Sequence, residues 1–155
     1  MTTAPGAPPS GATILVVDDD HDSREIAARL LERVGYRCRR AASGAECLAM
    51  VEAEPVDLIL LDVTMPGMDG FAVCSALQER GQHIPIILLT ARDDQDTRLE
   101  GIHHGVAEFL TKPINRVELY ARVRAQLHIL ELGRQLERVE ANLVGAIPPR
   151  PADRR

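Results

Sequence analysis

The chain has 155 residues, of which 45% are hydrophobic, and it carries a net charge of −5 at neutral pH. This length suits one domain with a substantial core, and the acidic balance argues against direct binding of nucleic acids. No apolar run reaches the length of a membrane span and no signal peptide is apparent, so we expect a soluble, cytoplasmic protein without membrane contact. The three cysteines form no Cys-x-x-Cys motif, which favours reduced thiols.

Short apolar segments alternate with helical patterns along the chain. In chain order we expect a strand at 13–17, a helix at 22–34, a strand at 36–40, a helix at 44–53, a strand at 56–61, a helix at 70–80, a strand at 84–90, a helix at 95–104, a strand at 107–111 and a last helix from residue 115. Asp20 and Asp69 are interpreted as helix caps, and Ser43 followed by Glu46 predicts a capping box. The alternation predicts a doubly wound α/β domain with a parallel sheet.

Polar side chains stand where four of the predicted strands end. The acidic run 18–20 follows the first strand, Asp62 ends the third, Thr90 ends the fourth, and Lys112 follows the fifth. Parallel strands bring their carboxyl ends to one edge of a sheet, where open α/β sheets bind their ligands. Two carboxylates about 4 Å apart repel by roughly 4 kcal/mol at an effective dielectric constant near 20, so the cluster implies a bound cation or strongly shifted pKa values. A divalent metal is the simpler explanation.

In this order, Asp18-Asp19, Asp62, Thr90 and Lys112-Pro113 closely resemble the receiver domain of two-component response regulators, over about residues 13–130. The resemblance implies a flavodoxin-like sheet with strand order 2-1-3-4-5 and five helices. It also implies a signalling phosphoacceptor that assists its own phosphorylation and dephosphorylation, and is not otherwise an enzyme. Asp62 would take the phosphoryl group from a phosphohistidine on a sensor histidine kinase or a histidine phosphotransfer protein.

The resemblance assigns Mg²⁺ as the cofactor. Asp19 and Asp62 would bind it directly, Asp18 directly or through water, and the backbone carbonyl of Thr64 would supply a further ligand. Such an oxygen set suits the octahedral coordination of Mg²⁺. Asp20 is interpreted as a cap of the first helix and not as a ligand.

Thr90 and Lys112 would contact the phosphoryl group once it is bound, and Lys112-Pro113 resembles the cis peptide of the family. Phe109 is expected either as a simple core residue or as the aromatic switch that swings inward when Thr90 is drawn to the phosphoryl group. By the same resemblance, Thr64 and Arg92 occupy positions that tune the lifetime of the phosphorylated state.

The last helix carries two apolar stripes. The first is expected to pack on the sheet and consists of Tyr120, Val123, Leu127 and Leu130. The second follows alternating steps of three and four residues and consists of Ile129, Leu132, Leu136, Val139 and Leu143. This spacing predicts a short coiled-coil seam that could join two copies of the chain, although Gly133 weakens it and the helix could instead fold back on its own domain.

We therefore divide the chain into a disordered lead-in at 1–12, a receiver domain at 13–130, a helical extension at 131–147 and a Pro/Arg tail at 148–155. Two other functions remain open. A small phosphohydrolase of the haloacid dehalogenase type also uses a strand-end Asp nucleophile, but it would want a second Asp where Thr64 stands. A receiver-like scaffold that is never phosphorylated is the other alternative.

Overall fold

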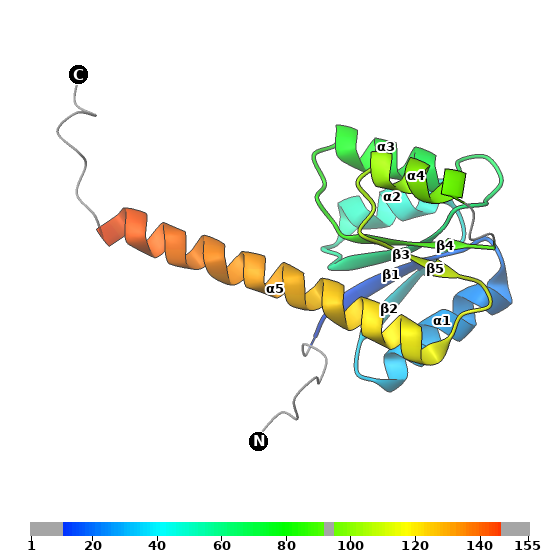
Figure 1. Ribbon diagram of the computed structural model, residues 1–155, viewed down its shortest axis with the longest axis horizontal. Helices are drawn as coiled ribbons and strands as arrows, with labels where there is room; N and C mark the ends of the chain where they lie inside the picture. The colour runs from blue at the N-terminus through cyan, green and yellow to red at the C-terminus, as the bar shows by residue number, and fades with distance from the viewer. Residues whose placement is uncertain (1–10, 92–94, 147–155) are drawn as a thin grey trace.

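A parallel sheet of five strands lies at the centre of the fold (Figure 1). The computed structural model describes residues 11–91 and 95–146. The strands are β1 (Thr13–Val17), β2 (Arg37–Ala41), β3 (Leu58–Asp62), β4 (Ile86–Thr90) and β5 (Glu108–Thr111). Their order is β2-β1-β3-β4-β5 and every neighbouring pair is parallel, which confirms the predicted topology.

Helices cover both faces of this sheet (Figure 1). They are α1 (His21–Arg33), α2 (Gly44–Ala53), α3 (Gly70–Glu79), α4 (Gln95–His103) and α5 (Arg116–Ala146). One hydrophobic cluster joins the sheet to α2 and α3, and the other joins it to α1 and α5. The three central strands are buried on both faces, which explains their continuous runs of Ile, Leu and Val.

The expected elements are all present, with small shifts at their ends. Val56 and Ile84 were expected inside strands, but they lie in the connecting segments just before β3 and β4. Both still pack on the hydrophobic cluster that contains α2 and α3. Their apolar character therefore reflects burial in the core and not a place in the strand ladder.

The predicted helix caps are confirmed. The side chains of Asp20, Ser43 and Asp69 each accept a hydrogen bond from the backbone N–H three residues ahead, at 2.8, 3.1 and 2.8 Å. The capping box at Ser43 differs in one detail, because the carboxylate of Glu46 accepts its hydrogen bond from the N–H of Ala42 at 3.3 Å. It therefore satisfies the N–H one residue earlier than a regular capping box would.

Helix α5 begins on the domain and then leaves it (Figure 1). Val123 and Leu127 are buried, and Tyr120 and Leu130 are partly buried against the same cluster, as predicted. Leu119, which the predicted stripe omitted, is also fully buried. From residue 132 to residue 144 every side chain of α5 is exposed, so this part of the helix does not fold back on the domain.

Several predictions concern residues outside those described, namely the lead-in up to residue 10, Arg92 and the tail at 148–155. Ala12, at the end of the expected lead-in, is buried, and its carbonyl accepts a hydrogen bond from Arg37 N–H at 3.0 Å. The boundary at residue 130 falls inside one continuous helix, so the proposed domain division stays a prediction. No helix within 11–91 and 95–146 is both long and apolar enough to cross a membrane.

Candidate functional site

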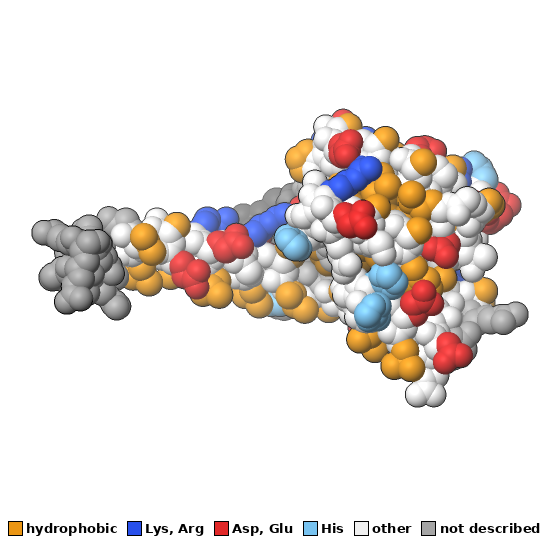
Figure 2. All heavy atoms as spheres, turned by 90° about the horizontal axis from the view of Figure 1, so that it is seen from above, with side chains coloured by type: hydrophobic (Ala, Val, Ile, Leu, Met, Phe, Trp, Pro, Cys, Tyr) orange, Lys and Arg blue, Asp and Glu red, His pale blue; other side chains and the backbone are white. Residues whose placement is uncertain are grey.

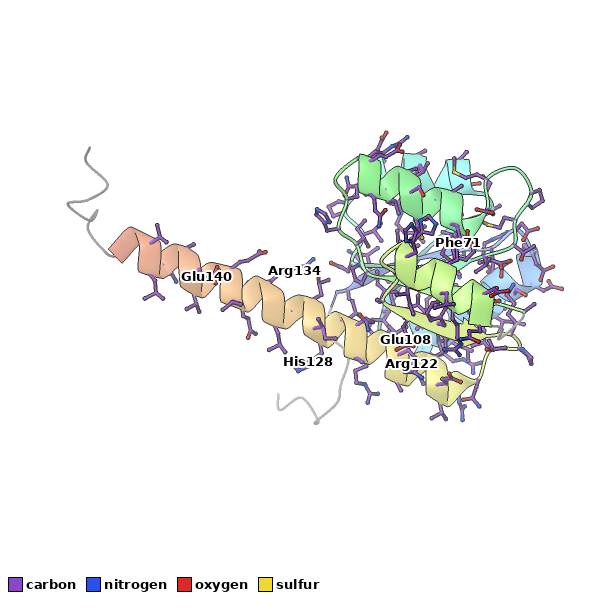
Figure 3. All side chains as sticks on the ribbon, turned by 45° about the horizontal axis from the view of Figure 1, so that its top comes forward. Phe71, Glu108, Arg122, His128, Arg134 and Glu140 are labelled. Carbon is purple, nitrogen blue, oxygen red and sulfur yellow. The ribbon has the colours of Figure 1, made fainter. Side chains whose placement is uncertain are left out.

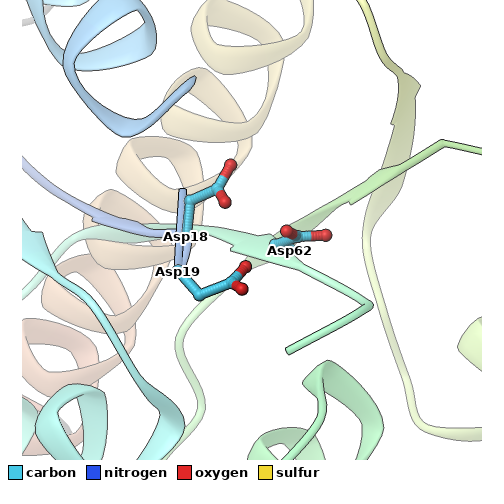
Figure 4. Close-up of side chains that lie close together, drawn as sticks. All are labelled: Asp18, Asp19 and Asp62. Atoms are coloured by element: carbon cyan, nitrogen blue, oxygen red, sulfur yellow. The ribbon is translucent and has the colours of Figure 1, made fainter. Parts of the chain in front are cut away.

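Three carboxylates gather at the carboxyl ends of two neighbouring strands (Figure 4). Asp18 and Asp19 directly follow β1, and Asp62 is the last residue of β3. One carboxylate oxygen from each lies within 4.8 Å of the others. Asp18 and Asp62 are almost completely buried, whereas Asp19 is exposed. The structure thus brings together the three carboxylates that the strand ends predicted.

Lys112 lies between the two buried carboxylates. Its ammonium group donates hydrogen bonds to Asp18 Oδ2 at 2.8 Å and to Asp62 Oδ2 at 3.1 Å. The residue follows β5 and is joined to Pro113 by a cis peptide bond, as expected. Burial alone would lower the pKa of Lys112, but the hydrogen bonds to Asp18 and Asp62 outweigh burial and raise it. Lys112 is the only lysine of the chain, and it stays charged at neutral pH.

Burial makes the carboxyl group of Asp62 easier to protonate than an exposed aspartate. Burial raises the pKa of Asp62 to about 6, and the nearby charge of Asp18 acts in the same direction, while Lys112 opposes both. Its second oxygen, Oδ1, accepts a hydrogen bond from the N–H of Thr64 at 3.1 Å. The side chain is therefore held from both sides, with its oxygens directed to the edge of the sheet.

Asp18 and Asp20 are already engaged by other partners. Asp18 Oδ1 accepts a hydrogen bond from the N–H of Asp20 at 3.0 Å, and its other oxygen binds Lys112. The carboxylate of Asp20 caps α1, and the hydrogen bond from Ser23 N–H lowers the pKa of Asp20. Asp19 is the exposed carboxylate of the three and remains open to the solvent side of the cluster.

Thr90 is the last residue of β4 and is buried beside the site. Its neighbour Leu89 pairs with Asp62 in the register of β3 and β4, which places Thr90 at the same edge of the sheet. Thr64 is exposed in the loop after β3, where its N–H is turned toward Asp62. The predicted roles of the Thr90 hydroxyl and of the Thr64 carbonyl stay predictions.

Phe109 points into the domain from β5, and only 9% of its surface is exposed. The guanidinium group of Arg98 lies 5.4 Å from the centre of its ring. A Cβ atom at Gly101 of α4 would lie only 2.5 Å from ring atom Cε1. The glycine therefore makes the room that this ring position needs. Its switching role stays a prediction.

Two contacts at the site were not anticipated from the sequence. Gly70 begins α3 and packs so closely on the end of β3 that a Cβ atom there would lie 2.7 Å from the carbonyl oxygen of Asp62. Arg24 of α1 donates a hydrogen bond to the carbonyl oxygen of Asp18 at 2.9 Å. A glycine at the start of a helix signals close packing only weakly, and an arginine in an amphipathic helix signals nothing of this kind.

Comparisons with known proteins point to one family. The sequence profile of the response regulator receiver domain matches residues 14–124. Over 116 residues the chain is 45% identical to the response regulator PleD of Caulobacter vibrioides (strain NA1000 / CB15N), a match that covers 74% of this chain and 26% of PleD. The chain spans about a quarter to a half of the length of the curated relatives that it matches.

Solved structures share the fold as well. A CheY-like response regulator receiver domain protein from Methanospirillum hungatei JF-1 has a TM-score of 0.75 at 27% identity, covering 80% of this chain and 99% of that one. The BeF3-activated DrrB receiver domain has a TM-score of 0.68 at 31% identity, covering 76% and 97%. The strand order, the acidic cluster and a profile match over more than half of the chain lead to one conclusion: the chain belongs to the response regulator receiver domains of two-component signalling.

Proposed function

We propose that this protein accepts a phosphoryl group on Asp62 from a phosphohistidine of a sensor histidine kinase or a histidine phosphotransfer protein. The observation that carries the proposal is the cluster of Asp18, Asp19 and Asp62 around the ammonium group of Lys112. With all three carboxylates ionised and Lys112 protonated, two negative charges are left uncompensated. A divalent cation balances them, and the all-oxygen ligand set suits Mg²⁺.

The carboxylates and the carbonyl of Thr64 are the groups that we propose to hold Mg²⁺. When bound, Mg²⁺ supplies positive charge to the oxygens of the transferred phosphoryl group. An oxygen of Asp62 forms the new bond to phosphorus as the bond to the histidine nitrogen breaks, and the imidazole keeps that electron pair. The ammonium of Lys112 and the hydroxyl of Thr90 then stabilise the oxygens of the aspartyl phosphate.

The two other candidate functions receive less support. A phosphohydrolase of the haloacid dehalogenase type needs an acid/base carboxylate two residues after the nucleophile, and Thr64 offers only a hydroxyl group there. A scaffold that is never phosphorylated has no use for two buried carboxylates that share the single ammonium group of Lys112, because one buried negative charge then stays uncompensated and costs stability. We accordingly assign the phosphorylated state a signalling output, through a change in dimerisation or in partner binding, in the cytoplasm.

Labelled acetyl phosphate with Mg²⁺ tests the proposed phosphorylation. The wild-type chain is expected to take up label that is lost in alkali, and Asp62→Asn is expected to take up none. Asp69→Asn is the matched control, because Asn caps a helix as well as Asp and should preserve labelling. Stoichiometric label on Asp62→Asn would overturn the proposal.

Mg²⁺ binding is expected to depend on Asp19 far more than on Asp20. The Asp19 carboxylate belongs to the cluster, whereas that of Asp20 is used by the N–H of Ser23. Asp19→Asn should weaken Mg²⁺ binding at least about tenfold, and Asp20→Asn, which keeps the cap, less than about threefold. Isothermal titration of both variants measures this. Equal losses would show that the ligands are wrongly placed.

The pH dependence of Mg²⁺ binding follows from Asp62. Burial raises the pKa of this carboxylate to about 6, and protons compete with Mg²⁺ for it. The apparent affinity for Mg²⁺ should therefore fall as the pH drops through about 6.

Without metal, the free energy of unfolding should change with pH in the opposite direction and rise as the pH drops. The folded-state pKa lies above the ordinary value of 3.8, so the stabilisation is fully present below about pH 4 and is lost as the pH rises through about 6.

Titrations of Mg²⁺ between about pH 5 and about pH 8 measure the competition, and denaturant unfolding with a chelator over the same range measures the stability. Asp62→Asn should flatten both profiles around pH 6. An Asn variant that keeps the same profiles would assign the titration to another group.

A further inference from the structure

Five apolar side chains of α5 form a continuous exposed stripe that begins at Ile129, at the end of the domain, and runs along the extension. They are between 50% and 60% exposed, and we call them the α5 seam: Ile129, Leu132, Leu136, Val139 and Leu143. Their spacing of three and four residues keeps them on one side of the helix. Figure 2 shows hydrophobic side chains along one edge of the extended helix, with charged groups along the other. No side chain within 11–91 and 95–146 covers this stripe.

The helix that carries the seam is fixed to the domain. Arg134 donates a hydrogen bond to Asp57 Oδ1 at 2.9 Å, and Asp57 Oδ2 accepts one from the N–H of Thr13 at 2.8 Å. Tyr120, near the start of α5, donates its hydroxyl hydrogen to the carbonyl of Leu30 at 2.9 Å. Helix α5 is therefore tied at two distant points, to α1 and to the residue just before β3, and these contacts direct the helix that carries the seam.

The flanks of the seam are almost free of charge. One flank carries His128, Gln135 and Asn142, and the other carries Gly133 and Glu140 (Figure 3). When two such helices run parallel, Gln135 of one lies opposite Glu140 of the other, so no like charges face each other. The charged groups of the extension bind one another away from the seam, as Glu131 and Arg138 do at 3.3 Å.

We infer that a second copy of this chain docks on the α5 seam and forms a parallel two-helix dimer. The stripe is self-complementary in shape and chemistry, and the neutral flanks remove the repulsion that two identical charged surfaces would have. The seam has three residues at the first heptad position and two at the fourth. In a parallel pair each seam residue faces the same residue of the other copy, which gives five layers. In an antiparallel pair residues at the first position face residues at the fourth, so one of the three first-position residues has no counterpart.

This inference goes beyond the proposed function and does not rest on it, since the seam lies along the outer part of α5 and not at the carboxylate cluster. Gly133 lowers the helix propensity of the segment that carries the seam, and five layers make a short interface. We therefore expect weak dimerisation in the resting state that depends on protein concentration, and we expect it equally in Asp62→Asn, which cannot be phosphorylated.

Sedimentation equilibrium of the full chain measures the association. Leu136→Lys places a charge inside the seam and should raise the dimer Kd at least about tenfold. Val144→Lys is the matched control, since Val144 is also an exposed apolar residue of α5 but lies beside the seam, and it should change Kd less than about threefold. A monomer at every concentration, a larger oligomer, or equal effects of the two variants would overturn the dimer.

The orientation of the helices is tested by oxidation of Leu132→Cys. In the parallel dimer each introduced thiol faces its counterpart, so an intermolecular disulfide should form rapidly, and Val144→Cys should form it slowly. The native thiols are poor competitors, because burial raises the pKa of Cys38 and Cys47 to about 12 and that of Cys74 to about 11. Dimers that give no disulfide at residue 132 would overturn the parallel arrangement.

Discussion

Lys112→Met should lower the free energy of unfolding by about 2–4 kcal/mol at neutral pH without divalent cations, because it leaves two buried carboxylates facing each other. Asp18 and Asp62 both bind the ammonium group of Lys112, at 2.8 and 3.1 Å. Saturating Mg²⁺ should restore most of the loss by supplying the missing charge, and so should acid, by protonating Asp62. Denaturant unfolding with chelator and with Mg²⁺ measures the difference.

Arg122→Met is the matched control for this substitution. Arg122 binds Glu108 at 3.0 Å on the surface (Figure 3), and such exposed pairs contribute only about 0–1 kcal/mol. The decrease in the free energy of unfolding of Arg122→Met should therefore be small and should not depend on Mg²⁺. Lys112→Met should still accept label slowly but lose the response to phosphorylation. Equal stability of wild type and Lys112→Met, or a loss that Mg²⁺ does not reduce, would contradict this account.

Gly70→Ala should destabilise the protein by about 2–3 kcal/mol and slow phosphorylation, because the added methyl group meets backbone that cannot easily move. A Cβ atom at Gly70 would lie 2.7 Å from the carbonyl oxygen of Asp62 and 2.9 Å from Cα of Val63. The N–H of Gly70 also donates to the carbonyl of Val63 at 2.9 Å, which holds the two segments together. The start of α3 and the end of β3 must therefore move apart, which shifts Asp62 at the end of β3.

Gly133→Ala is the contrasting change for this test. Apart from the neighbouring backbone of its own helix, no atom of the described residues lies within 4 Å of a Cβ atom there. Alanine should stabilise that part of α5 by up to about 1 kcal/mol, visible as slower hydrogen exchange in the extension, and leave phosphorylation unchanged. If Gly70→Ala proved as harmless as Gly133→Ala, the close packing of α3 on β3 would not position Asp62.

The site could be located from the sequence because the carboxyl ends of all the parallel strands lie at the same edge of the sheet. Asp18, Asp62 and Lys112 each end or follow a strand, and all parallel strands end at one edge. The strand ends therefore predicted which carboxylates would meet. The hydrogen bonds from Lys112 to two different carboxylates could not be predicted, since they depend on side-chain directions that no local pattern encodes.

Other features depend on contacts between distant residues. Arg134 and Asp57 are 77 positions apart, so their hydrogen bond, which helps to direct α5, leaves no local trace in the sequence. Gly101 resembles any unfavourable glycine in a helix until the ring of Phe109 is placed beside it. The heptad spacing of the α5 seam is local, and it was visible from the sequence for that reason.

Reduction of the phosphorylated wild-type protein with borohydride tests the central claim most directly. Borohydride converts an aspartyl phosphate to homoserine, so the modified residue can be identified in peptides by mass spectrometry without any substitution in the chain. We predict homoserine at position 62 alone, formed only when acetyl phosphate and Mg²⁺ are both present. Homoserine at another aspartate, or label that stays on a histidine, would contradict the assignment of Asp62 as the phosphoacceptor.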